Sequence, residues 1–83
     1  MRYWFNVRNG NGFTPDEEGQ LACDASAARR IAIESIRSII CEEALLGKLD
    51  LSGEIDVWCD NEDVAFTVAF IDAFDLRLPA EDT

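Results

Sequence analysis

The chain has 83 residues and a formal net charge of −10, from 17 acidic and 7 basic side chains. This length supports a single domain with one thin core, and we take residues 1–83 as that domain, with a frayed tail at about 79–83. An acidic surface repels phosphate backbones and anionic lipid, which argues against direct nucleic-acid or membrane binding. No stretch approaches the ~20 apolar residues of a membrane span, so we expect a cytoplasmic protein.

Residues 2–8 alternate between apolar and polar positions, which predicts a half-buried strand. Tyr3, Phe5 and Val7 fall on one face, and Trp4 falls on the other. Asn and Gly tolerate positive φ, so the sequence NGNG at 9–12 predicts a turn. The stretch GQLAC at 19–23 is expected to return as an edge strand, in a hairpin with a long, irregular connection.

That connection carries three consecutive acids, Asp16, Glu17 and Glu18. A calcium loop needs oxygen ligands at alternating positions and a closing Glu about twelve residues in, whereas adjacent side chains diverge. We therefore predict a structural turn and no metal site. In that turn Asp16 or Glu18 caps exposed amides and Gly19 supplies an unusual φ.

Asp24 is placed to cap a helix that runs to Leu46, with Gly47 as its terminating residue. Helical periodicity gathers an apolar stripe that we expect to be buried: Ala28, Ile31, Ala32, Ile36, Ile39 and Leu46. The further apolar residues Ile33, Ile40 and Ala44 widen this stripe beyond the needs of one small sheet. This excess hints at a second contact surface.

Two more alternating runs, 54–60 and 64–71, predict the last two strands. In the second run we expect one face in the core (Val64, Phe66, Val68, Phe70) and one outside it (Ala65, Thr67, Ala69, Ile71). The predicted fold is α+β in ββαββ order: a four-stranded, mainly antiparallel sheet with one long helix packed on one face.

The opening of the chain carries two ordered motifs, Pro15-Asp16-x-Glu18-Gly19 and Asp24-x-x-Ala27-Ala28. With the later segments LDLSGEIDV and VAFIDAF, it resembles a family of short bacterial proteins, mainly alphaproteobacterial, catalogued as a domain of unknown function. The resemblance covers nearly the whole chain. It implies no activity, cofactor or catalytic residue, because the family has none established.

The residues themselves give no support for catalysis. The chain has no histidine, and Lys48 is its only lysine, so a Ser or Cys nucleophile lacks the usual base. The three cysteines form no metal-binding or disulfide pattern and are expected as small buried residues. A second acidic cluster is read as solvated hairpin residues: Asp56, Asp60, Glu62 and Asp63. We predict neither an enzyme nor a cofactor.

Trp4 and Trp58 are expected on the open face of the sheet, beside small residues, as an apolar patch typical of interfaces. Cross-strand packing of the two rings with no partner is the alternative. We predict a non-catalytic interaction module with an unidentified protein partner, self-associating as a homodimer or docking through the open face. The alternative function is an acidic decoy, antitoxin-like or phage-inhibitor-like, on a partner's basic nucleic-acid-binding surface. The candidate partner-binding residues are Trp4, Asp16, Glu17, Glu18, Asp56, Trp58, Ala65, Thr67 and Ala69.

Overall fold

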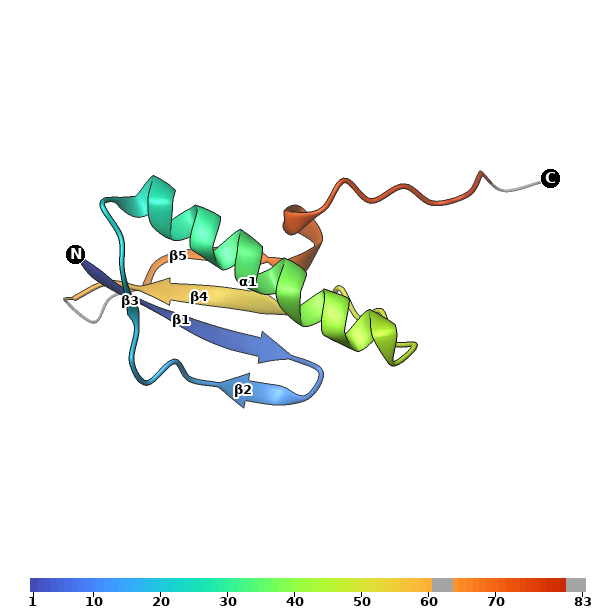
Figure 1. Ribbon diagram of the computed structural model, residues 1–83, viewed down its shortest axis with the longest axis horizontal. Helices are drawn as coiled ribbons and strands as arrows, with labels where there is room; N and C mark the ends of the chain where they lie inside the picture. Colours follow the sequence, from blue (N-terminus) through green and yellow to red (C-terminus); the bar gives the residue numbers. More distant parts are fainter. Residues whose placement is uncertain (61–63, 81–83) are drawn as a thin grey trace.

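The computed structural model describes residues 1–60 and 64–80, and Figure 1 shows one long helix lying across one face of a sheet. The elements in chain order are β1 (Arg2–Asn9), β2 (Gly12–Thr14), β3 (Gln20–Leu21), α1 (Ala25–Leu45), β4 (Glu54–Trp58), β5 (Val64–Ala69) and the 3₁₀ turn η1 (Phe70–Ala73). The predicted α+β class with one helix and an antiparallel sheet is confirmed. The sheet has five strands rather than four, because β2 was not predicted, whereas β3 lies within the predicted return strand at 19–23.

The sheet order is β2-β1-β4-β5, and β3 pairs with the other end of β1. Val7 to Asn9 of β1 pair with β2, and Arg2 and Tyr3 pair with β3, so both short strands lie on one edge of β1. The predicted antiparallel pairing of the first strand with a return strand near residues 19–23 is confirmed by β1 and β3. The connection between them was expected to be irregular, but it contains β2, which forms a tight hairpin with β1 at the NGNG turn. The acidic loop lies between β2 and β3.

The helix boundaries agree with the prediction at both ends. The Asp24 carboxylate accepts a hydrogen bond from the Ala27 backbone N–H at 2.9 Å. Beyond the helix, Gly47 has a φ of +87°, and its N–H bonds the Ala44 carbonyl at 2.9 Å. Leu46, expected in the core, is 87% exposed. The reason is geometric, since the last turn of α1 extends past the end of the sheet (Figure 1).

The core lies between α1, the sheet and η1. Its buried residues are Tyr3, Phe5, Ala28, Ala32, Ile36, Ile40, Ile55, Val57, Val68, Phe70 and Ala73. Ile40 thus belongs to the core rather than to an additional surface. Among the described residues, no helix is long and apolar enough to cross a membrane.

Three features of the predicted core need correction. Phe66 is only partly buried, and Val64 is 50% exposed. A register shift after Val57 pairs Trp58 with Val64, which takes Val64 away from the helix. The cysteines are not uniformly buried either, because Cys23 and Cys41 are exposed.

Candidate functional site on the open face of the sheet

The open face is the side of β1, β4 and β5 that points away from α1. Side chains alternate along each strand, so every second residue reaches this face. Strand pairing arranges these residues in three cross-strand rows: Trp4, Trp58 and Val64; Asn6, Asp56 and Thr67; Arg8, Glu54 and Ala69. The open face therefore has an aromatic end and a polar middle.

The aromatic end holds a shallow pocket of about 240 Å³, which we name the tryptophan pocket. Trp4 and Trp58 are directly opposite each other on β1 and β4, so both lie on the open face. The pocket is lined by Trp4, Asn6, Asp16, Trp58, Cys59 and Asp60. It thus combines two indole rings with two carboxylates, a combination suited to a cationic group.

Asp16 reaches the pocket because its side chain holds the acidic loop against β1. Its carboxylate accepts a hydrogen bond from the Phe5 backbone N–H at 3.1 Å and another from the Gly19 N–H at 3.1 Å. Asn6 completes this contact, since its side-chain oxygen accepts from the Asp16 N–H at 2.8 Å. Asp16 therefore supplies a hydrogen-bond acceptor to the backbone of β1 in the gap between β2 and β3, where neither strand pairs with it.

Gly19 allows the loop to approach β1 this closely. Its φ is +71°, a conformation that costs little for glycine alone. A Cβ at this position would lie 2.7 Å from the Tyr3 carbonyl oxygen and 3.0 Å from Trp4 Nε1. The loop is also anchored by Arg2, whose Nη1 donates to the Glu18 carbonyl at 2.7 Å. These contacts support the predicted structural role of the loop.

The remaining acids of the loop are placed differently. The side chains of Glu17 and Glu18 are exposed, whereas the carboxylate of the preceding Asp16 is hydrogen-bonded to the backbone. Within residues 1–60 and 64–80, no group of three or more metal-ligating side chains is close enough to hold an ion. Glu62 and Asp63, from the second predicted acidic cluster, lie outside the described residues.

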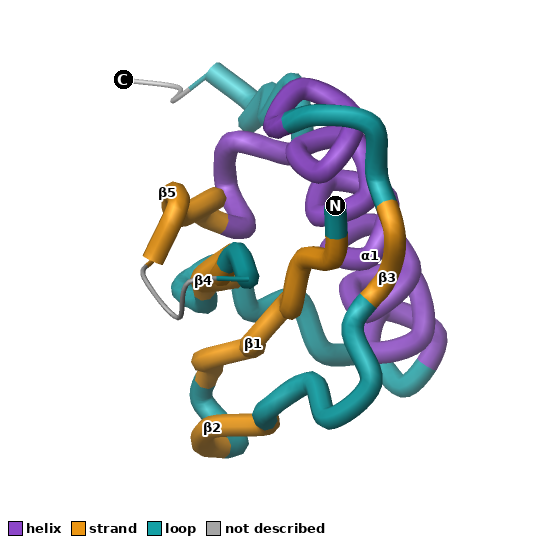
Figure 2. Tube along the Cα trace, turned by 90° about the vertical axis from the view of Figure 1, so that its left-hand side faces the viewer, coloured by secondary structure: helices purple, strands orange, loops and turns teal. Residues whose placement is uncertain are grey.

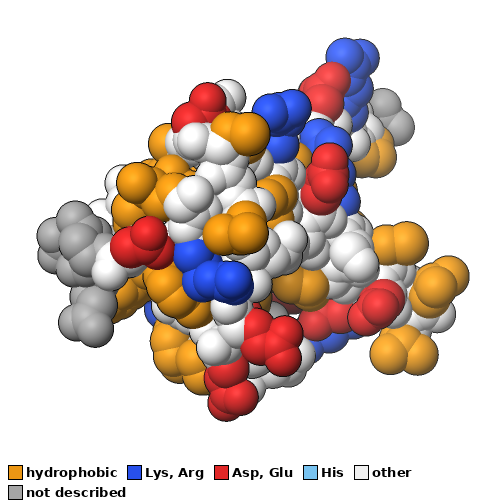
Figure 3. Space-filling view, turned by 60° about the vertical axis from the view of Figure 1, so that its left-hand side comes forward, with side chains coloured by type: hydrophobic (Ala, Val, Ile, Leu, Met, Phe, Trp, Pro, Cys, Tyr) orange, Lys and Arg blue, Asp and Glu red, His pale blue; other side chains and the backbone are white. Residues whose placement is uncertain are grey.

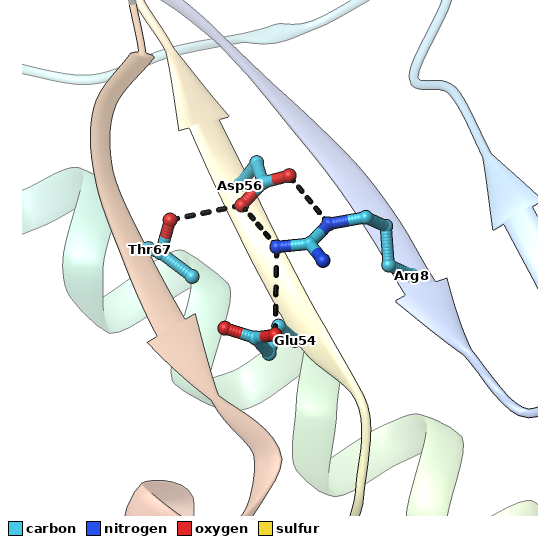
Figure 4. Close-up of polar contacts among 4 residues, drawn as sticks. All are labelled: Arg8, Glu54, Asp56 and Thr67. Atoms are coloured by element: carbon cyan, nitrogen blue, oxygen red, sulfur yellow. Dashed lines mark hydrogen bonds and ion pairs between the residues drawn. The ribbon is translucent and has the colours of Figure 1, made fainter.

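A polar network crosses the middle of the open face (Figure 4). The Arg8 guanidinium forms a two-pronged pair with Asp56, Nε to Oδ2 at 2.8 Å and Nη2 to Oδ1 at 3.0 Å. Glu54 lies 3.5 Å from the same guanidinium, and the Thr67 hydroxyl donates to Asp56 at 2.8 Å. The hydrogen bond from Arg8 lowers the pKa of Asp56, opposed by partial burial and assisted by Thr67. The same bond and the charge of Asp56 raise the pKa of Arg8, and Glu54 adds to this.

This network changes the expected composition of the open face. The predicted apolar patch joined the tryptophans to Ala65, Ala69 and Ile71, but the network lies between the tryptophan pocket and Ala69. Ile71 belongs to η1 rather than to a strand. Acidic and basic side chains also lie among hydrophobic ones on the side of the molecule drawn in the space-filling view (Figure 3).

The structure brings together only part of the predicted site. Trp4, Trp58 and Asp16 share the pocket, whereas Asp56 and Thr67 belong to the polar network. Ala65 and Ala69 lie on β5, at the edge of the sheet. The sequence-based site omitted Asn6, Arg8, Cys59 and Asp60. Because every second residue of a strand reaches the same face, Trp4 was a sufficient signal to place Asn6 and Arg8 on the open face. The pairing of Arg8 with Asp56 could be predicted only with the strand order.

Comparison with known proteins gives a match to a protein family. No curated protein and no solved structure matches the chain. A family model matches residues 2–71, a range that includes all five strands, the helix and the whole lining of the tryptophan pocket. The chain therefore belongs to the family described as a domain of unknown function, DUF6894.

Proposed function

We propose that this protein is a non-catalytic interaction module that binds a partner protein through the tryptophan pocket. The observation that carries the proposal is the meeting of Trp4 and Trp58 with the carboxylates of Asp16 and Asp60 in one open pocket. Tryptophan is the aromatic residue most favourable to cations and among those most enriched at binding hot spots. The partner group that fits this chemistry is an arginine or lysine side chain.

One cation–indole contact is too weak to hold a partner protein, so the partner must make several contacts. A cation over an indole ring contributes about 0.5–2 kcal/mol, depending on how far it is desolvated. A single basic side chain therefore gives weak binding, and a useful partner must also cover neighbouring surface. The exposed Glu17 and Glu18 follow Asp16 in the chain, and with the net charge of −10 they attract a basic segment over a longer range.

Several sequence features support a binding role rather than a catalytic one. The chain has no histidine and a single lysine, so acid–base and nucleophilic chemistry lacks its usual groups. We place the protein in the cytoplasm of a bacterium, as the resemblance to short alphaproteobacterial proteins implies. The exposed cysteines Cys23 and Cys41 suit a reducing compartment.

A second candidate function is the acidic decoy, which occupies the nucleic-acid-binding surface of its partner. The four acids that favour it are Asp16, Asp60, Glu17 and Glu18, in or next to the pocket. A decoy covers many basic residues, so its complex weakens steeply as salt is added. A partner held by one or two basic side chains and indole contacts shows a much shallower dependence.

The test is a fluorescence titration of the two tryptophans with an arginine-containing peptide and with a matched peptide in which citrulline replaces arginine. We expect a saturable change with the arginine peptide alone. Trp58→Leu should abolish it, whereas Phe13→Leu, an exposed aromatic opposite Arg8 on β2, should not change it. Equal binding of both peptides, or full binding by Trp58→Leu, would contradict the proposal. Repeating the titration at low and high salt separates the two candidate functions.

A further inference from the structure

The two edges of the sheet are finished in different ways. The outer side of β1 is covered by β2 and β3, and the Asp16 carboxylate fills the gap between them. At the other edge, β5 is the last strand in the order, and no described residue pairs with its outer side. Figure 2 shows β5 at the end of the row formed by β5, β4, β1 and β2. Within residues 1–60 and 64–80, one edge is thus closed by the chain and the other is open.

The hydrogen bond between Phe70 and Gly53 identifies which groups of β5 face outward. Phe70 N–H donates to the Gly53 carbonyl at 2.9 Å, directly beyond the pair Glu54 and Ala69. Bonded and non-bonded pairs alternate in an antiparallel ladder, so Val68 and Phe66 also bond to β4. The backbone N–H and C=O groups of Thr67 and Ala69 therefore point to the open edge.

The open edge lacks the usual protection against strand pairing. Edge strands are commonly shielded by lysine, proline, a central bulge or a covering segment. Val64–Ala69 contains no charged residue and no proline, although the chain as a whole carries −10. Its register shift lies at the first residues only. This segment is a place where two copies can meet without opposing carboxylates.

We propose that a second copy of this chain pairs with β5 in antiparallel orientation, so that the two sheets join into one. Thr67 is the outward-facing residue nearest the middle of the strand, and centring the two-fold axis on it uses the whole strand. Thr67 then bonds Thr67 of the second copy, and Ala65 lies opposite Ala69 of the second copy. The contact relies on backbone hydrogen bonds, as in other cases of strand addition.

A groove beside the edge supports this register. Phe66 is only partly buried, and with Ala25, Ser26 and Arg29 it lines a groove of about 310 Å³ between α1 and β5. In the proposed pair, Phe66 lies opposite Val68 of the second copy, on the helix side of the sheet. The apolar surface that α1 leaves uncovered at Phe66 is then covered by the second copy.

This arrangement places self-association at the edge rather than on the open face. A two-fold axis perpendicular to the joined sheet puts both helices on one side and both tryptophan pockets on the other. The pockets stay accessible, so the dimer presents two binding sites to one partner. The inference does not depend on the function proposed for the pocket.

The first test is sedimentation velocity of three proteins over a range of concentrations. Ala69 has a φ of −75°, which proline also adopts, so Ala69→Pro removes an outward N–H without straining the backbone. We expect the wild type and the Ala69→Ser control to form dimers at micromolar concentration, strengthened by salt, which screens the repulsion of two acidic copies. Ala69→Pro should remain monomeric. A monomeric wild type, or an Ala69→Pro protein that dimerises equally well, would overturn the proposal.

Amide hydrogen exchange tests the wild type without any substitution. The Thr67 and Ala69 amides should exchange quickly in dilute solution and more slowly as the concentration rises. The Phe66 and Val68 amides, which bond to β4, serve as the internal control and should be protected throughout. Concentration-independent exchange at Thr67 and Ala69 would overturn the edge pairing, even if the protein dimerised through another surface.

Discussion

The side chain of Asp16 acts as a substitute for a strand, because its carboxylate accepts the hydrogen bond of the Phe5 backbone N–H at 3.1 Å. A carboxylate bonded to backbone amides replaces the carbonyl that a continuous return strand would supply. The same side chain brings a negative charge to the rim of the tryptophan pocket. One acid of the loop thus contributes to both the fold and the candidate site.

Removing this carboxylate should destabilise the fold. Asp16→Ala leaves the Phe5 and Gly19 amides without their acceptor, and we expect a loss of about 1–3 kcal/mol in the free energy of unfolding. Glu17→Ala, the neighbouring exposed acid, should change it by less than about 0.5 kcal/mol. Urea denaturation of both variants measures the difference. Equal stabilities would mean that the loop does not depend on Asp16.

Two glycines with positive φ should respond unequally to alanine. Both substitutions carry the conformational cost of about 1–2 kcal/mol. At Gly19 the new Cβ would also meet the Tyr3 carbonyl at 2.7 Å, whereas at Gly47 nothing lies within 4 Å. We expect Gly19→Ala to be clearly the less stable variant in thermal unfolding. A larger loss for Gly47→Ala would contradict the observed approach of the loop to β1.

The helix face can be checked by truncating one residue at the core and one at the helix end. Ile36 is fully buried, so Ile36→Ala should cost about 2–4 kcal/mol through lost burial and a cavity. Leu46 is 87% exposed, and Leu46→Ala should cost less than about 0.5 kcal/mol. Calorimetric melts of the two variants give the comparison. If Ile36→Ala were as stable as the wild type, a different face of α1 would have to pack on the sheet.

The pair of Arg8 and Asp56 should contribute to stability in a defined pH range. Arg8 lowers the pKa of Asp56 below its ordinary value of 3.8, so the charged carboxylate favours the folded state. This contribution is present above pH 3.8 and is lost as the pH falls through the lower pKa of the folded protein. Asp56→Asn should therefore be less stable than the wild type at neutral pH, with the difference disappearing in strong acid.

The control for this prediction is Asp75→Asn. Asp75 and Arg77 also form an ion pair at 3.0 Å, but their side chains are 77% and 85% exposed. Such a pair contributes little, so this variant should follow the wild type at every pH. Hydrogen bonds from Ser52 also lower the pKa of Asp50. The stability of Asp56→Asn should therefore still decrease somewhat in acid. A constant difference between wild type and Asp56→Asn down to strong acid would contradict the linkage.

Local signals in the sequence were enough to predict the ends of the helix and the faces of the strands. Asp24 and Gly47 mark the ends of α1 through side-chain and backbone chemistry that acts over a few residues, and alternation placed Trp4 and Trp58 on one face. Leu46 was misplaced because periodicity carries no information on where the sheet ends. Val64 was misplaced because the register shift depends on the pairing with Trp58.

The candidate site was less predictable for the same reason. Its residues come from β1, the acidic loop and β4, and only the strand order brings these segments together. The consecutive acids gave no indication that Asp16 bonds the backbone while Glu17 remains exposed. That division depends on the gap between β2 and β3, because Phe5 lies on the stretch of β1 that neither strand pairs with.

The most direct test of the proposed function is to observe the two indole N–H signals by NMR while an arginine-containing peptide is added. The protein has two tryptophans, so each signal reports one wall of the pocket. We predict that both signals shift saturably and that the matched citrulline peptide leaves them in place. Peptide binding that moves signals elsewhere in the protein, with both indole signals unchanged, would contradict the assignment of the pocket as the binding site.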